Sequence, residues 1–140
     1  MNPDLHNAMD ALKKDSCTCV LCRGAILHTS HSRGVKPLLD WLEDDIGRDF
    51  SAADKVVGRA AAYLYCLLGI RQLYAQVISR PALAVLEKYG IPTRYDRLVD
   101  GIRNRAGDGP CPMEAATADA KTPEQALTMI RETLEKLRTS

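Results

Sequence analysis

The sequence lacks any long hydrophobic run. No apolar stretch reaches the ~18 residues of a transmembrane helix. The N-terminal segment, MNPDLHNAMDALKKD, does not contain the apolar stretch of a secretory signal peptide. We therefore expect a cytoplasmic protein with no membrane partner, and in that compartment its five cysteines should mostly be thiols.

An excess of charge of one sign is also missing. The chain has 19 Lys and Arg against 18 Asp and Glu, which gives a formal net charge of +1. This balance offers no electrostatic reason to expect a nucleic acid or an anionic membrane as partner. The sequence contains no internal repeat and no low-complexity segment, so it does not predict a solenoid or a disordered tail.

The chain does have the length and composition of one folded domain. It comprises 140 residues, of which 46% are apolar. A chain of this size can bury a hydrophobic core without the support of metals or disulfides. We therefore predict a single domain over residues 1–140.

Three cysteines lie close together in SCTCVLCRG, residues 16–24. If this stretch is extended, Cys17 and Cys19 share one face and Cys22 lies on the other. Two side chains on one face of a strand are about 6.6 Å apart, whereas two thiolates on one zinc ion are at most ~4.6 Å apart. We therefore predict buried cysteines that act as small hydrophobes, and no metal site. His28 and His31 are expected to be solvated or hydrogen-bonded.

Hydrophobic spacing and turn residues predict alternating helices and strands. Arg23 and Gly24 lie between two strand-forming runs and predict a hairpin turn. The predicted strands cover residues 17–22, 25–30, 70–79 and 91–99, and the predicted helices cover residues 3–14, 37–46, 51–69, 80–89, 111–120 and 122–140. We expect Ser51 to cap the helix at 51–69, with Asp54 completing an acidic capping box.

These elements predict an α/β fold, a three-layer sandwich in which helices flank a mixed sheet. The hairpin strands are antiparallel, whereas helical crossovers make the later strands parallel. In such sheets ligands bind beyond the carboxyl ends of the strands, near helix N-termini. The closing helix is expected to begin with Thr122 as cap, Pro123 at its first position and Gln125 in a capping box.

Four segments resemble a known bacterial family. They are SRGVKPLLDWL, ADKVVGRAAAYL, YAQVISRPALAVLEKYGI and NRAGDGPCPMEAA, and together they cover most of the chain. These segments are similar to a family that is described only as domain of unknown function 1893. The fold of that family is like that of cytidine deaminases. The resemblance implies a cytidine deaminase-like sheet with helices on both faces.

The chain departs from the zinc deaminases at their metal site. Those enzymes place a His or Cys two residues before a catalytic Glu at the start of one helix, and two cysteines after a proline at the start of the next. Here the corresponding openings are AADKVV and SRPALAVL, which contain none of these residues. The resemblance therefore implies the scaffold without zinc hydroxide chemistry, and we expect no cofactor.

Polar residues are nevertheless expected to converge at this end of the sheet. The candidate ligand-binding residues are Lys55, Ser79, Arg80, Arg33 and Lys36, and the candidate catalytic residues are Cys111, Glu114 and Asp54. Each also has an ordinary explanation: Asp54 and Ser79 as helix caps, and the four cations as surface charges.

Cys111 is a candidate nucleophile because it precedes Pro112 near a predicted helix start, where backbone N–H groups favour a thiolate. Glu114, one turn further on, would either bond back to the backbone of that cap or repel the thiolate. The ordinary alternative is a cap whose sulfur packs under the loop, since no nearby histidine supplies a base.

Three functions follow from these residues. The leading hypothesis is a protein that binds a small anionic or nucleotide-like ligand, because helix N-termini and Lys and Arg side chains suit an anion. The second is an enzyme with Cys111 as nucleophile. The third is an interaction module whose edge strand or terminal helix docks a protein, for example in a homodimer.

Overall fold

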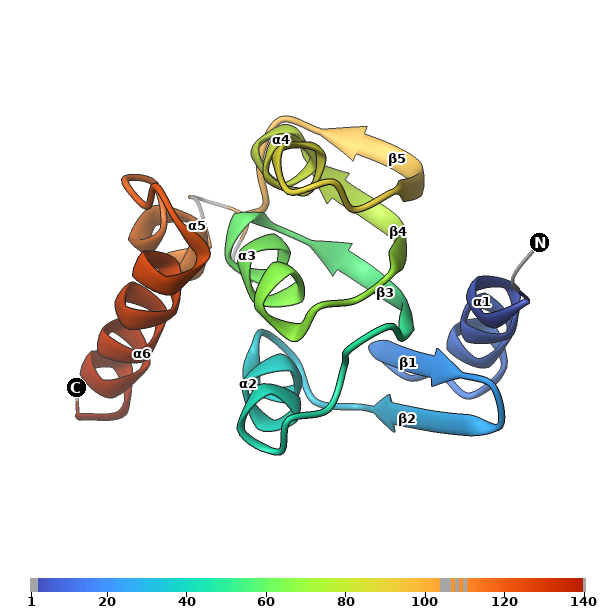
Figure 1. Ribbon diagram of the computed structural model, residues 1–140. Coiled ribbons are helices and arrows are strands. Elements are labelled where there is room, and N and C mark those ends of the chain that lie inside the picture. The colour runs from blue at the N-terminus through green and yellow to red at the C-terminus, as the bar shows by residue number, and fades with distance from the viewer. Residues whose placement is uncertain (1–2, 104–106, 108, 110, 140) are drawn as a thin grey trace.

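The computed structural model describes residues 3–103, 107, 109 and 111–139 of the chain. Within these residues the sheet has five strands in the order β2-β1-β3-β4-β5 (Figure 1). The strands are β1 (Cys19–Arg23), β2 (Ile26–Ser30), β3 (Ser51–Val57), β4 (Gln72–Ser79) and β5 (Thr93–Val99). The helices are α1 (Asp4–Lys14), α2 (Lys36–Glu43), α3 (Arg59–Leu68), α4 (Arg80–Lys88), α5 (Pro112–Ala116) and α6 (Pro123–Thr139).

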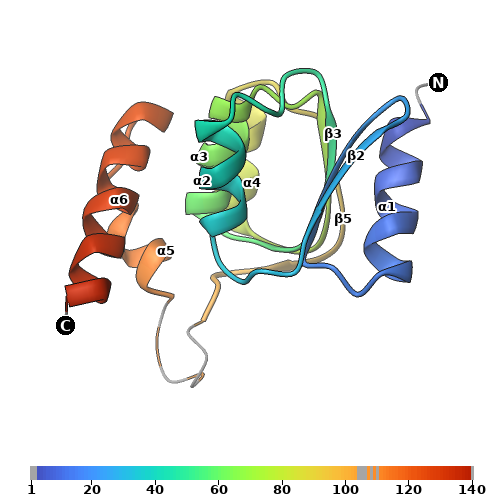
Figure 2. The same cartoon turned by 90° about the horizontal axis from the view of Figure 1, so that it is seen from below.

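The predicted mixed sheet between helices is confirmed. Strand β1 is antiparallel to both β2 and β3, whereas β3, β4 and β5 are parallel. Helix α1 covers one face of the sheet, and α2, α3 and α4 cover the other (Figure 2). Helices α5 and α6 lie outside α3, so they add a layer beyond the three that we predicted.

Several local predictions are confirmed by the structure. Gly24, with φ +60, allows the turn between β1 and β2. Ser79 caps α4, since its Oγ accepts a hydrogen bond of 3.2 Å from the Ala82 N–H. Thr122 likewise accepts from the Gln125 N–H at 3.1 Å, although the Gln125 amide oxygen accepts from Lys121 rather than from the cap itself.

The predicted helix at residues 51–69 is wrong. Residues 51–57 form the buried strand β3, and a helix begins only after Gly58. Ser51 therefore caps no helix, and its Oγ accepts a hydrogen bond from the Gln72 side chain on β4. The small residues of SAADKVV permit a helix, but pairing with β1 and β4 on either side selects the strand.

The predicted facing of the three cysteines is also wrong. Cys17 precedes β1 and packs with Cys22 in the core under α1, whereas Cys19 packs in the larger core under α2, α3 and α4. Ser16, with φ +54, turns the chain just before this stretch, so regular alternation starts only at Cys19. All three side chains are buried, as predicted.

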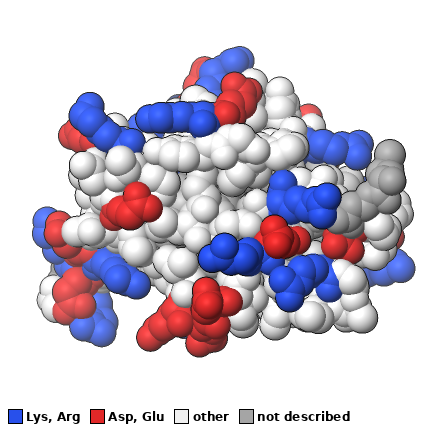
Figure 3. Space-filling view, in the orientation of Figure 1, with Lys and Arg blue, Asp and Glu red and all other residues white. Residues whose placement is uncertain are grey.

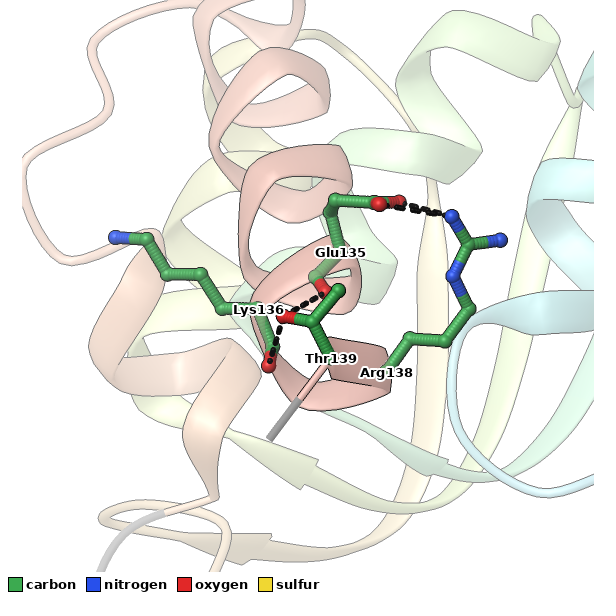
Figure 4. Close-up of polar contacts among 4 residues, drawn as sticks. All are labelled: Glu135, Lys136, Arg138 and Thr139. Atoms are coloured by element: carbon green, nitrogen blue, oxygen red, sulfur yellow. Dashed lines mark hydrogen bonds and ion pairs between the residues drawn. The ribbon is translucent and has the colours of Figure 1, made fainter.

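The end of α6 is exposed. The Arg138 guanidinium donates to both carboxylate oxygens of Glu135, and Thr139 Oγ1 donates to the carbonyls of Glu135 and Lys136 (Figure 4). These contacts satisfy carbonyl groups of the last turn, and the exposed ion pair contributes little stability.

Candidate functional site

A cavity of about 390 Å³ lies at the carboxyl end of β3, where α3 begins. Its walls come from the start of β1, the end of β3, residues 32–35 before α2, residues 102–103 after β5, and residues 111–114 at α5. An α/β sheet commonly binds ligands at this position. The cavity is therefore the candidate site.

Asp54 is one of two buried carboxyl groups that the structure describes in the cavity wall. It is 7% exposed, and the Tyr65 hydroxyl of α3 donates to its Oδ2 at 2.6 Å. The Val56 N–H donates to Oδ1 at 3.2 Å. Burial raises the pKa of Asp54 to about 7, although hydrogen bonds from the Tyr65 hydroxyl and from the backbone N–H groups of Val56 and Lys55 oppose the shift. The capping box that we predicted for Asp54 does not exist, and Asp54 instead presents a carboxyl group that titrates near neutrality.

Cys19 lies beside Asp54, its partner across the β1–β3 ladder. Burial, and then the charge of Asp54, raise the pKa of the Cys19 thiol above its ordinary value. The neighbouring Thr18 hydroxyl donates to the carbonyls of Ser30 and Ser32, which ties this corner of the cavity to the loop after β2. Cys19 is therefore a neutral, apolar part of the wall.

Glu114 is the second buried carboxyl group, at 6% exposed. Its Oε1 accepts a hydrogen bond from the backbone N–H of Arg59, and the Arg59 guanidinium donates to the Glu114 carbonyl at 3.3 Å. Gly58, the N-cap of α3, has no capping side chain, so Glu114 caps this helix from α5. Burial raises the pKa of Glu114, against the lowering effect of the Arg59 N–H and charge. Of the two alternatives considered for Glu114, the bond back to its own cap is not the one made: its Oε1 accepts from Arg59, and the Cys111 N–H donates to the Ile102 carbonyl.

Among the described residues, three cations line the cavity. Arg33 comes from the loop before α2, Lys55 from β3 and Arg103 from the segment after β5. Lys55 is half-buried and the two arginines are exposed, so the positive charges are placed to meet an anion that enters from solvent. Cys111, which precedes α5, lines the same cavity and is half-buried.

The other three candidates do not line this cavity. Lys36 forms an exposed ion pair with Asp40 at 2.8 Å, and Arg80 forms one with Asp100 at 2.9 Å. Ser79 is buried and caps α4. Helix α4 starts directly after β4, on the side of β3 away from β1, whereas β1 and β3 line the cavity, so the predicted convergence is wrong for these residues.

The sequence prediction missed Tyr65, Gly58, Arg59 and Arg103. Tyr65 lies eleven positions after Asp54, and a single helix through both would keep them three turns apart. Only the reversal of the chain at Gly58 brings them together. A Gly between a β-branched pair and an alanine-rich run was the signal that could have revealed this reversal.

The described residues do not fit a metal site. Across residues 3–103, 107, 109 and 111–139, no three His, Cys, Asp or Glu side chains are placed to hold a metal ion. Helix α3 opens with Arg59-Ala60-Ala61 and α4 with Arg80-Pro81-Ala82, none of which is a usual zinc ligand. In the same ranges, no helix has both the length and the apolar character needed to cross a bilayer.

Comparisons with known proteins concern the whole chain. Residues 7–134 match the family model described as "TM1506: Domain of unknown function (DUF1893)". The crystal structure of a DUF1893 family protein (TM1506) from Thermotoga maritima is similar to this structure, with a TM-score of 0.86 and 27% sequence identity. The match covers 97% of this chain and 91% of that chain. No curated protein matches the sequence.

Proposed function

The chain belongs to the DUF1893 family of domains of unknown function, and from this premise we propose that it binds a small anionic or nucleotide-like ligand in the cavity beside β3. A family described in this way brings no activity with it, so the proposal depends on the site itself. The observation that carries it is the set of cations Arg33, Lys55 and Arg103, which line one cavity from three separate segments.

The shape and lining of the cavity support a ligand of this kind. Its volume of about 390 Å³ is within the ~300–1,000 Å³ typical of small-molecule sites. Val35, Val56, Ile102 and Met113 provide apolar walls for the body of a ligand, such as a heterocycle. The cations are then available for its phosphate or carboxylate group.

A cytidine deaminase-like scaffold is the second part of the proposal. The mixed sheet with helices on both faces supports it. Because the openings of α3 and α4 carry no zinc ligands, the scaffold would bind its ligand without zinc chemistry.

The test is a thermal-shift screen of the purified chain with inorganic phosphate, nucleosides and nucleoside monophosphates. We expect the anionic compounds to raise the Tm of the wild-type chain, because a ligand that binds only the folded state stabilises it by about 2.7 kcal/mol at a hundred times its Kd. Arg33→Ala and Lys55→Ala should reduce this shift. Lys36→Ala and Arg80→Ala are matched controls, since each removes a cation that lies outside the cavity.

Two results would contradict the proposal. One is a screen in which no anion moves the Tm. The other is an equal loss of the shift in the cavity variants and the control variants, which would indicate nonspecific binding to surface charge. On the face drawn in Figure 3, cations and carboxylates are interspersed, so no large field of one sign favours such binding there.

A second candidate function is an enzyme that uses Cys111 as its nucleophile. Cys111 lines the same cavity as Asp54 and Glu114. Burial raises the pKa of the other four thiols, those of Cys17, Cys19, Cys22 and Cys66, in the last case to about 12. We expect iodoacetamide near neutral pH to label Cys111 before the others, and faster than a free cysteine peptide if Cys111 is activated. Labelling at the peptide's rate would remove the nucleophile hypothesis, and the control is Cys111→Ser.

A further inference from the structure

Asp54 differs from Glu114 in what balances its charge. The Glu114 carboxylate meets the N-terminus of α3 and lies near the Arg59 guanidinium, so positive charge compensates it. Asp54 accepts hydrogen bonds from neutral donors, the Tyr65 hydroxyl and the Val56 N–H. In the part of the chain that the structure describes, no ion pair joins Asp54 to a cation.

Several elements of the fold place titratable or charged groups around Asp54. Facing it or lining the same cavity are Cys19 of β1, Lys55 of β3, Tyr65 of α3, Arg33 before α2, Arg103 after β5, and Cys111 and Glu114 at α5. The β4 neighbour is Ala75, which carries no charge. Among these groups, the cations lie at the solvent side and the buried Asp54 lies in the wall.

An anion inside this cavity must come close to the Asp54 carboxyl group. A sphere of the cavity's volume is about 9 Å across, close to the ~8 Å over which physiological salt screens charges. Two negative charges at such a distance repel each other. As in paired carboxylates that share one proton, the carboxyl group takes up a proton.

We propose that the cavity takes its anionic ligand together with one proton, which Asp54 holds. The inference rests on the proposed function and specifies its ligand chemistry, an anionic oxygen of a phosphate ester or a free oxyanion that accepts a hydrogen bond from the protonated carboxyl group. The proton comes from solvent, forms an O–H bond on Asp54 and returns to solvent when the ligand leaves. No electron is transferred. Burial already raises the pKa of Asp54 to about 7 in the chain without ligand, so a nearby anion can make this carboxyl group take up a proton near neutral pH.

Calorimetric titration in buffers of different ionisation enthalpy tests the proposal. The probes are a 3′,5′-cyclic nucleotide and sulfate, whose charges stay constant between about pH 6 and about pH 8.5, so that any proton uptake belongs to the protein. The two probes also distinguish a phosphate ester from a free oxyanion. For the wild-type chain we expect net uptake approaching one proton per ligand at about pH 8. Affinity should fall by up to tenfold per pH unit above about 7 and change little below it.

Asp54→Asn should abolish both the proton uptake and the pH dependence, whereas Lys36→Ala should retain them. Uptake that persists in Asp54→Asn but disappears in Glu114→Gln overturns the assignment to Asp54. Binding of a probe with no proton uptake by the wild-type chain overturns this inference and leaves the proposed function standing. Failure of both probes to bind overturns this inference, and a thermal-shift screen in which no anion moves the Tm removes the proposed function as well. If Asp54→Asn does not fold, the affinity of the wild-type chain at several pH values still tests the proposal. An affinity that does not fall above about pH 7 overturns it.

Discussion

Asp54 links the candidate site to the stability of the protein. Its carboxyl group is buried in the cavity wall, and burial raises its pKa to about 7. Between about pH 4 and about pH 7 the folded chain therefore holds more protons on this group than the unfolded chain does. The contribution of Asp54 to the free energy of unfolding must then decrease as the pH rises through this window.

We predict that Asp54→Asn changes the pH dependence of stability. The wild-type chain should lose up to about 1.4 kcal/mol per pH unit in this window because of Asp54, and the variant should not. The amide oxygen of Asn can still accept from Tyr65. Urea unfolding at several pH values measures the difference, with Asp40→Asn, an exposed carboxyl group, as control. Parallel curves for the wild-type chain and Asp54→Asn would contradict the prediction.

Gly58 allows Glu114 to reach the start of α3. A Cβ atom at residue 58 would lie 2.5 Å from Glu114 Oε1 and 3.2 Å from Ile102 Cγ1. The φ of Gly58 is −97, which any residue adopts, so the requirement for glycine is one of space and not of backbone freedom.

We therefore predict that Gly58→Ala lowers the free energy of unfolding by about 1 to 3 kcal/mol, because it displaces Glu114 and leaves the Arg59 N–H unpaired. Gly101→Ala is the matched control, since the structure describes no atom within 4 Å of the added Cβ. Denaturant titration compares the two. The double variant Gly58→Ala/Glu114→Ala should lose less stability than the sum of the losses of the two single variants, because without the Glu114 side chain the added Cβ meets no carboxylate. Equal stability of Gly58→Ala and Gly101→Ala would contradict the prediction, because it would show that Glu114 moves aside without any loss of stability.

At the scale of elements, α5 lines the cavity, and α6 packs against both α5 and α3. Helix α6 packs on α3, and Ile130 is fully buried there. Helix α5 supplies Met113 and Glu114 to the cavity, and Cys111 precedes it. The position of the cavity wall therefore depends on the packing of α6 onto α3.

We predict that Ile130→Ala costs about 2 to 5 kcal/mol of stability and loosens this wall. Amide hydrogen exchange should accelerate most in residues 112–139, while the sheet retains its protection. Leu137→Ala, at an exposed position of the same helix, should change stability by no more than about 0.5 kcal/mol. Exchange that accelerates equally in the sheet would mean that α6 and the sheet unfold together.

At the scale of the whole molecule, the two edges of the sheet differ. The edge strand β2 has the sequence ILHTS, which contains no Lys, Arg, Asp or Glu, and its Ile26 and Leu27 are 46% and 47% exposed. The opposite edge strand β5 carries Arg94, Asp96 and Arg97. Charged side chains discourage an edge from pairing with another chain, so β2 is the less protected edge.

We predict that the chain forms a homodimer through β2 at high concentration. Size-exclusion chromatography with light scattering should detect a mass that rises with concentration for the wild-type chain and stays that of a monomer for Leu27→Lys. Val56→Lys, which adds a charge at an exposed position away from that edge, is the control and should dimerise as the wild-type chain does. A monomer at every concentration would contradict the prediction.

The sequence by itself determined the features that depend on neighbouring residues. The Arg23-Gly24 turn, the caps at Ser79 and Thr122, and the amphipathic helices at both ends follow from signals within one or two turns of chain. The mixed α/β sheet was predictable from the order of such elements. Of the candidate residues, Asp54, Lys55, Arg33, Cys111 and Glu114 line one cavity.

Only the tertiary structure decided that residues 51–57 are a strand, because their pairing partners β1 and β4 lie far along the chain. The same holds for the pairs that make the site. Tyr65 reaches Asp54 after the chain reverses at Gly58, and Glu114 caps a helix that begins 55 residues earlier. Local propensity acts over a few residues, whereas burial and hydrogen-bond partners in a packed core depend on the whole fold. Burial and hydrogen-bond partners in turn set the charge state and the position of each group in the cavity.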